Sequence, residues 1–447
     1  MENENTDRRR FIGKLARLAA LGGIASLLSS QQLEKVNADT HGTTGSFIGI
    51  DNSNNVWDNY GVITGGQYNT AGSNDGDTTT QPYATVGGGY GNTANGDSAT
   101  VGGGRSNTAS GAGAFVGGGG FDGMTYPGNT ASGNASTVGG GAGNTASNRY
   151  ATVGGGYANM ASGYVALVGG GYNNTASGAG AFVGGGGCDE TNASSNVASG
   201  NASTVGGGLG NTATGNWATV GGGDSNTASE INATVGGGYH NAASGSYATV
   251  SGGNVNAASN GCATFGGGTN NTASSNYATI DSGYSNAASG SYATVGGGEY
   301  NTAAGDYSFA AGRKAKINWV HAGAFLFADS NDFYFNSSAS NEFAVRATGG
   351  ARFVTAIDGI TGAPTRSIVM TPSGNLGVGT SAPAASIHGE ATSANPAIKG
   401  RNTGTGVGIR GESSGGYGVL GKTTSTTGKA GVYGYGSGSA IGVRAES

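Results

Sequence analysis

One apolar position recurs along the chain and predicts a repeating β-fold. It is the Val of the segment Ala-Thr-Val-Gly-Gly-Gly, first complete at residues 84–89. Most successive copies are 15 residues apart, two steps are 22 residues, and the first is 23. A fixed period of this kind is typical of solenoids, so we predict about 16 coils. The recurring position is occupied by Ile63, Val86, Val101, Val116, Val138, Val153, Val168, Val183, Val205, Val220, Val235, Val250, Phe265, Ile280, Val295 and Ala310.

Each coil contains two short segments with the alternation of a β-strand. In residues 83–86, Ala84 and Val86 share one face, and Tyr83 and Thr85 share the other. The Ala84 place holds only Ala, Ser or Gly in all 16 copies, and the Ala94 place is Ala in all 15 second segments. Such small side chains predict a narrow interior between two strands, with Gly-Gly-Gly forming the tight turn.

The longer coils contain insertions, at residues 121–127 and 188–194. Both insertions fall just before the Asn that opens the second segment, which predicts one fixed corner where extra residues extend outward. Surface loops of this kind are candidates for binding a ligand. The residues in them that we select as candidates are Phe121, Tyr126, Asp189 and Glu190.

Bulky residues on the predicted outer face replace one another between coils. Where the Tyr83 place becomes Gly113 or Gly180, the place two residues later becomes Phe115 or Phe182. A solvated face needs no such replacement, so we predict a contact surface between copies of the chain, with a homotrimer as the expected assembly. The candidates on this surface are Tyr83, Phe115, Tyr150, Phe182, Trp217, Tyr247, Tyr277, Tyr292 and Tyr307.

Composition excludes several classes of protein. Gly accounts for 95 of 447 residues, yet it is not at every third place, so the chain is not collagen-like. Charged residues make up only 10%, and the net charge of -5 provides no basic surface for nucleic acid. Cys188 and Cys262 belong to coils about 24 Å apart at about 4.8 Å per coil, so we expect no disulfide between them.

Residues 1–38 have the layout of an export signal. Three consecutive arginines precede an apolar run, and small residues follow it. Arg8, Arg9 and Phe11 resemble the twin-arginine signal, although Asp7 stands where that signal has Ser or Thr. The resemblance implies an exported protein at the cell surface or outside the cell, which is not an integral membrane protein once the signal is removed. An amphipathic helix or a retained anchor is the alternative interpretation.

The consensus Tyr-Ala-Thr-Val-Gly-Gly-Gly-Tyr-x-Asn-Thr-Ala-Ser-Gly resembles the head repeat of trimeric autotransporter adhesins, the YadA-like or haemagglutinin-type repeat. The resemblance covers residues 60–312 and implies an all-β fold, a left-handed parallel β-roll with three chains side by side. The period of 15 is one residue longer than is usual in that family. Sixteen copies in register make the resemblance specific.

The regions around the repeats are less regular. Residues 39–59 are polar and are expected to form a leader or cap. Residues 313–340 contain Arg313, Lys314 and Lys316 followed by many aromatics, and are placed like the adhesin neck; a simple terminal cap is an equal alternative. Residues 341–390 resemble a segment of phage tail-fibre and related surface proteins. Residues 391–447 contain short Gly-Val repeats that predict a smaller β-rich region.

Candidate chemistry is sparse. The four His are far apart, so we predict no catalysis, no metal site and no cofactor. The repeating Asn is expected to satisfy backbone groups along the roll, with a sugar-binding row as the alternative. The repeating Thr forms a row like those of ice-binding solenoids, but Phe115, Leu167 and Phe182 interrupt it.

Together these features predict a non-enzymatic exported surface protein, an adhesin-like trimeric fibre that attaches to cells, matrix or surfaces through an unknown protein or glycan ligand. Two alternatives remain open. The first is a phage-like tail fibre or receptor-binding spike, which residues 341–390 favour and the export signal disfavours. The second is a purely structural sheath component with no specific ligand.

Overall fold

The chain forms two units that are built only from β-strands in the residues described. The computed structural model describes residues 44–49, 53–120, 127–188, 192–361, 363–378, 380, 382–383 and 386–389. The units are Met1–Arg346 and Ala347–Ser447. Within the described residues, the first unit is a parallel β-solenoid and the second contains a small four-stranded sheet. No helix in the described residues is long and apolar enough to cross a membrane.

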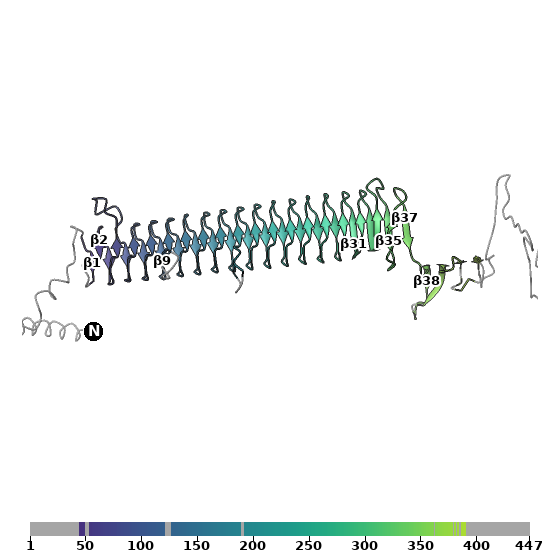
Figure 1. The fold of residues 1–447 in the computed structure, drawn as a ribbon, viewed down its shortest axis with the longest axis horizontal. Helices are drawn as coiled ribbons and strands as arrows, with labels where there is room; N and C mark the ends of the chain where they lie inside the picture. Colours follow the sequence, from purple (N-terminus) through teal and green to yellow (C-terminus); the bar gives the residue numbers. More distant parts are fainter. Residues whose placement is uncertain are drawn as a thin grey trace, which may run out of the picture. The chain divides into compact units, whose positions relative to one another are not determined.

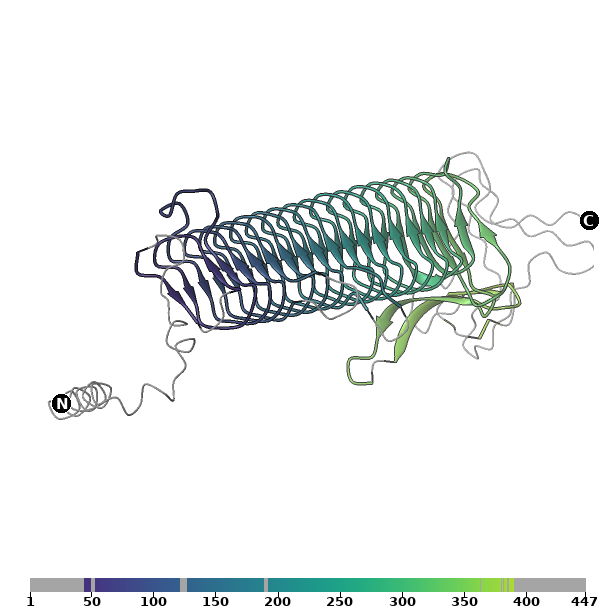
Figure 2. The same ribbon diagram turned by 60° about the vertical axis from the view of Figure 1, so that its left-hand side comes forward.

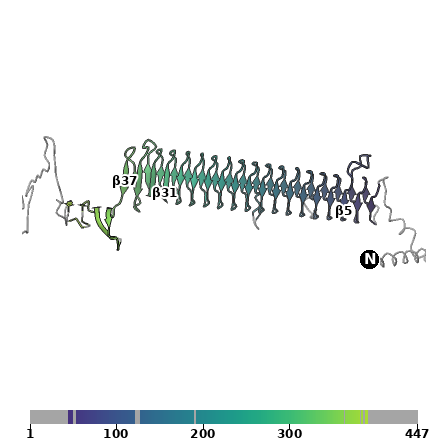
Figure 3. The same ribbon diagram turned by 180° about the vertical axis from the view of Figure 1, so that it is seen from behind.

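Two parallel sheets run along the solenoid, one on each side of its interior (Figures 1 and 3). We call them the odd sheet and the even sheet, after their strand numbers. The odd sheet has 19 strands, one from each coil. They are β1 (Phe47–Ile48), β3 (Val62–Ile63), β5 (Thr85–Val86), β7 (Thr100–Val101), β9 (Phe115–Val116), β11 (Thr137–Val138), β13 (Thr152–Val153), β15 (Leu167–Val168), β17 (Phe182–Val183), β19 (Thr204–Val205), β21 (Thr219–Val220), β23 (Thr234–Val235), β25 (Thr249–Val250), β27 (Thr264–Phe265), β29 (Thr279–Ile280), β31 (Thr294–Glu299), β33 (Phe309–Arg313), β35 (Phe325–Ala328) and β37 (Phe343–Arg346).

The even sheet is built from the second strand of each coil, and most of its strands are also only two residues long. They are β2 (Asn55–Val56), β4 (Thr70–Ala71), β6 (Thr93–Ala94), β8 (Thr108–Ala109), β10 (Thr130–Ala131), β12 (Thr145–Ala146), β14 (Met160–Ala161), β16 (Thr175–Ala176), β18 (Val197–Ala198), β20 (Thr212–Ala213), β22 (Thr227–Ala228), β24 (Ala242–Ala243), β26 (Ala257–Ala258), β28 (Thr272–Ala273), β30 (Ala287–Ala288), β32 (Thr302–Ala303), β34 (Ala315–Ile317) and β36 (Phe335–Asn336).

The interior of the solenoid is a stack of equivalent, buried side chains. The strand register pairs Val86 with Val101 and Ala94 with Ala109, so each side chain packs on its own counterpart in the next coil. These apolar side chains are fully buried, as is Phe265, the largest of them. The narrow interior predicted from the repeat is therefore confirmed. The interior is narrow because each coil places one small Ala from the even sheet opposite one larger residue, usually Val, from the odd sheet, and these two side chains fill the space between the sheets.

The solenoid has about 19 coils, where the sequence predicted about 16. It begins inside the expected leader, because Ile48 and Val56 are already buried as core residues. It also continues through residues 313–346, where Leu326 and Ala328 are buried in place of the usual Val and Gly. The repeat motif is lost at both ends, but the inward apolar positions remain, and burial depends on those positions rather than on the motif.

Tight turns with left-handed backbone close each coil. In the coil of residues 98–112, Ser98, Gly104 and Ser106 have φ values of 54°, 89° and 58°. Only the Gly104 place is glycine in every coil from Gly66 to Gly298. A Cβ added to Gly104 would lie 2.0 Å from the carbonyl oxygen of Gly119 in the next coil. Close stacking of backbones therefore requires the third glycine, even where the motif decays to Asp281-Ser282-Gly283.

The first insertion leaves the solenoid at a different corner from the one predicted. Asn69 and Asn92 are 23 residues apart, and the extra residues follow β4, after the second strand, instead of preceding the Asn. The loop is held by a hydrogen bond from the Asn59 N–H to the Thr78 carbonyl oxygen (2.8 Å) and another from the Ser73 N–H to the Asp58 carboxylate (2.8 Å). It is visible near the purple end in Figure 2. The expectation of one fixed insertion corner is thus wrong for this coil.

The second unit contains four strands, which we call the terminal sheet. They are β38 (Ala351–Ile357), β39 (Pro364–Met370), β40 (Leu376–Val378) and β41 (Ile387–Gly389). β38 pairs with β39 and β39 with β40 in antiparallel fashion, whereas β40 and β41 are parallel. Residues 341–390, which resemble tail-fibre proteins, therefore fall into two parts, because residues 343–346 belong to the solenoid and the terminal sheet begins at Ala351.

Candidate interaction surfaces

A ladder of asparagines is the main polar feature of the interior. Asn226 donates from Nδ2 to the carbonyl oxygens of Gly222 (2.9 Å) and Gly238 (2.8 Å), and its backbone N–H donates to Asn211 Oδ1 (3.0 Å). Every member of the ladder is at most 2% exposed. The prediction that these asparagines satisfy backbone groups is confirmed, and their burial excludes the alternative of a sugar-binding row. The ladder consists of Asn54, Asn69, Asn92, Asn107, Asn129, Asn144, Asn159, Asn174, Asn196, Asn211, Asn226, Asn241, Asn256, Asn271, Asn286 and Asn301.

The predicted outer rings of the Tyr83 place lie at a turn and not in a strand. Tyr83 has φ of 66°, and the strand that follows begins only at Thr85. We call this turn the ring corner. The alternation argument, which put Tyr83 and Thr85 on one extended strand, is wrong for this reason. The rings are nevertheless exposed, from 43% for Tyr150 to 69% for Tyr307. The others at this corner are Tyr60, Tyr83, Trp217, Tyr247, Tyr277 and Tyr292.

Neighbouring rings at the ring corner stack on one another. Tyr277, Tyr292 and Tyr307 form a continuous stack, with centroid distances of 4.8 and 5.1 Å and planes within 3° of parallel. Tyr60 and Tyr83 stack in the same way at 5.0 Å. The stacking distance matches the spacing of coils in the solenoid, about 4.8 Å. The scaffold therefore holds these phenol rings in two separate stacks, one at each end of the solenoid.

Phe115 and Phe182 occupy another part of the surface. Both lie on the outer face of the odd sheet and are 42% and 37% exposed. Their rings lie beside Gly117 and Gly184, at the end of the strand away from the ring corner. These Phe side chains therefore do not fill the place that the missing Tyr leaves. In the sequence, the same two coils carry the insertions at 121–127 and 188–194.

The structure reveals a second aromatic row that sequence reasoning missed. It follows the Gly-Gly-Gly turn, which we call the glycine corner, and includes Tyr90, Tyr239, Tyr284 and Tyr300 at 39–48% exposure. Tyr157 and Tyr172 stack there at 5.3 Å. The sequence signal was a recurrent Tyr at this turn: Tyr90 and Tyr239 directly follow Gly-Gly-Gly, Tyr284 follows Asp281-Ser282-Gly283, and Tyr300 stands one residue further on, after Glu299. The solenoid thus presents aromatic side chains along both of its corners.

The last coils differ from the rest in their outer face. Phe309, Phe325 and Phe343 stack at 4.8 and 5.0 Å where most earlier coils have Thr. Phe343 is 66% exposed, and Phe327 and Val345 lie exposed beside this stack. The sequence showed a concentration of aromatics here, but their alignment in columns depends on the strand register and was not predicted.

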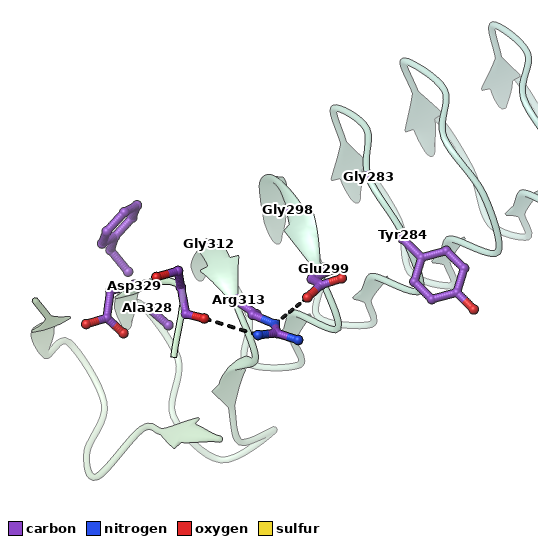
Figure 4. A pocket seen from close by; sticks show the side chains of 10 residues that line it. Gly283, Tyr284, Gly298, Glu299, Gly312, Arg313, Ala328 and Asp329 are labelled. Atoms are coloured by element: carbon purple, nitrogen blue, oxygen red, sulfur yellow. Dashed lines mark hydrogen bonds and ion pairs between the residues drawn. The ribbon is translucent and has the colours of Figure 1, made fainter. Parts of the chain in front are cut away.

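A shallow open groove of about 580 Å³ lies at the glycine corner of these last coils (Figure 4). Gly283, Gly298 and Gly312 line it together with the side chains of Tyr284, Glu299, Arg313, Phe327, Asp329 and Ser330. Arg313 pairs with Glu299 and with Asp332 (Nη2 to Oδ1, 3.1 Å), and it donates to the Ser330 carbonyl oxygen (3.1 Å). The charges around the groove therefore pair largely with one another, and pairs this exposed contribute little to stability.

Lys314 and Asp332 complete this charged cluster. Lys314 Nζ lies 2.5 Å from Asp332 Oδ1, and its hydrogen bond, together with the nearby Arg313, lowers the pKa of the Asp332 carboxyl. Lys314 also contacts the faces of Tyr300 and Tyr334, at 5.9 and 5.3 Å from the ring centroids. Arg313 and Lys314, the basic residues that suggested a neck, thus make contacts within their own chain.

Arg346 closes the end of the solenoid. Its Nε donates to Asp329 Oδ1 (2.8 Å), and its Nη2 donates to the carbonyl oxygens of Asn331 (2.9 Å) and Arg313 (3.2 Å). The guanidinium also lies over the ring of Phe335, 5.7 Å from its centroid. These contacts tie the final turn to the two coils before it, as a terminal cap does. The neck stays a prediction.

Several predicted residues cannot be placed. The insertion candidates Phe121, Tyr126, Asp189 and Glu190 lie outside the described residues, as do Arg8, Arg9 and Phe11 of the export signal and the Gly-Val repeats of 391–447. Cys188 is exposed and Cys262 is half-buried. Among the residues that are described, no three His, Cys, Asp or Glu side chains are grouped so that they could hold a metal ion.

The arrangement is suited to binding by contact. The interior of the solenoid is filled mainly by Val, Ala and Asn. The accessible features of the described residues include exposed aromatic rings at both corners, an aromatic face near the C-terminal end of the solenoid and a shallow groove. Comparison with protein-family models finds no family that matches the chain, and comparison with curated proteins finds no relative.

Proposed function

We propose that the protein is a non-enzymatic, exported surface fibre whose copies associate as a homotrimer and attach a cell to other cells, matrix or surfaces. The observation that carries the proposal is the set of exposed rings at the ring corner. Tyr247, Tyr277, Tyr292 and Tyr307 are each at least 49% exposed on a rigid rod. Soluble monomers rarely leave large apolar patches uncovered, because burying them is favourable.

The rod itself supports a mechanical role. Successive coils pair through both sheets from β1 and β2 to β35 and β36, and β37 adds to the odd sheet alone. Buried apolar side chains form one cluster from Ile48 to Ala328. Such an arrangement holds a binding surface away from an anchoring point and keeps its rings in register. The export-signal resemblance of residues 1–38 supports a place outside the cell.

The assembly part of the proposal is tested with the full-length protein and a triple variant, Tyr247→Ala, Tyr277→Ala and Tyr292→Ala. We expect light scattering to give the mass of three chains for the unchanged protein and increased dissociation for the variant. The matched control replaces Thr212, Thr227 and Thr272, on the outer face of the even sheet, with Ala. A folded monomer of the unchanged protein would refute the trimer.

The attachment part is tested by binding of the full-length protein to cells, collagen and glycan arrays. Binding that the Tyr variant loses and the Thr control keeps would support a role of the ring corner in attachment. Absence of binding to all of these surfaces would favour a structural sheath instead.

A second candidate is a phage-like tail fibre or receptor-binding spike. It is favoured by the change from solenoid to a separate antiparallel sheet after Arg346, within the segment that resembles tail fibres. Fractionation distinguishes the two candidates. Protein found only in virions and never in the cell envelope would reject the surface-fibre proposal.

A further inference from the structure

The two stacks of tyrosines at the ring corner lie close to the two ends of the solenoid. Tyr60 and Tyr83 precede β3 and β5, the second and third strands of the odd sheet along the chain. Tyr277, Tyr292 and Tyr307 precede β29, β31 and β33, after which the odd sheet has only β35 and β37. A linear array of coils opens most easily at its ends, because a terminal coil has a neighbour on one side only. The stacks therefore lie where a bond between neighbouring coils would stabilise the solenoid most.

The rings of both stacks are open to solvent and to small reagents. Tyr60 and Tyr83 are 45% and 56% exposed. Tyr277, Tyr292 and Tyr307 are 51%, 49% and 69% exposed. The phenol of tyrosine is among the side chains that lose one electron most readily, and exposure gives an oxidant access to it. The stacks are therefore candidates for a covalent modification of their rings.

We propose that these stacks are sites of oxidative coupling, in which hydrogen peroxide and a haem peroxidase join neighbouring tyrosines of one chain as dityrosine. Each phenol gives up one electron and one proton and becomes a phenoxyl radical. Two such radicals form a carbon–carbon bond between their ortho carbons, and the hydrogens on these carbons then move to the phenol oxygens, which restores both hydroxyls. For each cross-link, one molecule of peroxide takes up the two electrons and two protons and is reduced to two molecules of water.

The geometry of the stacks holds the reacting carbons near one another. The planes of Tyr277, Tyr292 and Tyr307 are within 3° of parallel and repeat with the coils, so equivalent ortho carbons are separated by about the centroid distance, 4.8 or 5.1 Å. Tyr60 and Tyr83 have the same arrangement, at 5.0 Å and 8°. Bond formation requires two exposed ring tips to tilt toward each other, and exposed side chains make such movements in ps–ns. The scaffold thus positions one radical beside the next, as proximity in a coupling reaction requires.

The order of residues along the ring corner selects which tyrosines couple. Tyr247 is 59% exposed at the same corner. In the coils on either side of it, however, Asn232 and Cys262 occupy the ring-corner place. Tyr247 therefore has no phenol beside it at this corner, and it provides a control that matches the stacked tyrosines in exposure and backbone conformation. The coupling takes place within one chain, so it depends neither on the proposed assembly nor on attachment.

The test treats the full-length protein with hydrogen peroxide and a haem peroxidase, and follows the products by dityrosine fluorescence and peptide mass spectrometry. We expect linked peptides that have lost two hydrogens and that join Tyr60 to Tyr83, and Tyr292 to Tyr277 or Tyr307. Tyr292→Phe keeps an aromatic ring in the stack but cannot form a phenoxyl radical. We expect this variant to lower the yield of all cross-links within its stack at least tenfold, and Tyr247→Phe to change that yield by less than twofold.

Hydrogen exchange then measures what the cross-links do to the solenoid. We expect exchange of residues 60–86 and 277–310 to slow at least tenfold after oxidation of the unchanged protein. Oxidised Tyr60→Phe should lack the effect in the first range and oxidised Tyr292→Phe in the second, which separates coupling from other effects of peroxide.

Three outcomes would overturn the inference. They are cross-links that join stacked and unstacked tyrosines equally often, cross-links found only between chains, and unchanged exchange in the coils that are joined. Failure of the proposed function is read separately, because a protein that neither forms trimers nor binds cells still reports coupling within its own chain.

Discussion

The solenoid and the terminal sheet differ in how their apolar side chains are buried. Most solenoid strands are two residues long, yet Val86, Ala94 and their counterparts are completely buried. In the terminal sheet, β38 and β39 are seven residues long, yet Phe353 and Ile368 remain exposed. The difference shows that long strands are neither necessary nor sufficient for burying apolar side chains. A solenoid coil is covered by its second strand and by its neighbours, whereas a single sheet leaves a face that needs another layer.

The largest expected effect on stability comes from truncating one buried Phe of the solenoid, and the same truncation of an exposed Phe in the terminal sheet provides the comparison. Phe265 is fully buried and Phe353 is 54% exposed. We expect Phe265→Ala to lower the free energy of unfolding of the surrounding coils by about 3–5 kcal/mol, since it leaves a cavity in a close-packed stack. Phe353→Ala is expected to change the stability of a single chain by less than about 0.5 kcal/mol. Hydrogen exchange of residues 250–280 and 351–370 measures both effects, and equal losses would contradict the contrast.

The next effect concerns the close stacking of backbones between coils, which stabilises a solenoid whose strands are only two residues long. Gly104→Ala places a methyl group against the next coil at φ of 89°, and we expect a loss of about 2–3 kcal/mol. Gly103→Ala is the control, because nothing lies within 4 Å of a Cβ added there. Hydrogen exchange of residues 98–120 measures local opening and distinguishes the two variants. Similar effects of both changes would show that the third glycine has no special role.

The asparagine ladder offers the third test. Asn226→Ala leaves the carbonyl oxygens of Gly222 and Gly238 and the N–H of Asn241 without their partner, and we expect a loss of about 2 kcal/mol. Asn254→Ala, at an exposed place, is expected to cost less than about 0.5 kcal/mol. Denaturant-dependent exchange of the flanking coils measures the difference. A tolerant Asn226 site would mean that water replaces the amide at no cost.

The smallest expected effect is a pH dependence at the end of the solenoid. The hydrogen bond from Lys314 and the charge of Arg313 lower the pKa of Asp332 in the folded state. This carboxyl therefore contributes stability that is present above about pH 4 and is lost as the pH falls through its lowered pKa. We expect residues 313–346 to open slightly more easily at pH 2.5 than at pH 5, by hydrogen exchange. Asp332→Asn should remove this part of the dependence, and an unchanged pH response in that variant would refute the assignment.

Some of the surface was predictable from local pattern, and some was not. The exposure of Tyr83 and Tyr292 followed from their places in the repeat, although their turn conformation did not. The row that includes Tyr90 and Tyr284 was missed, since the Tyr after Gly-Gly-Gly was treated as part of the turn. The contacts of Arg346 with Asp329 and Asn331 were beyond sequence reasoning, because they depend on how the last turns fold back on earlier coils.

The amino-acid sequence by itself determined the solenoid, its period and its interior. Repetition does this because each coil meets a copy of itself, so an inward Val or a buried Asn in one coil implies its partner in the next. Only the tertiary structure decided where the solenoid begins and ends, at which corner the rings lie and how the strands of the terminal sheet pair. Those features arise where the repeat fails, and there side-chain direction depends on strand register and turn geometry, which a linear pattern does not specify.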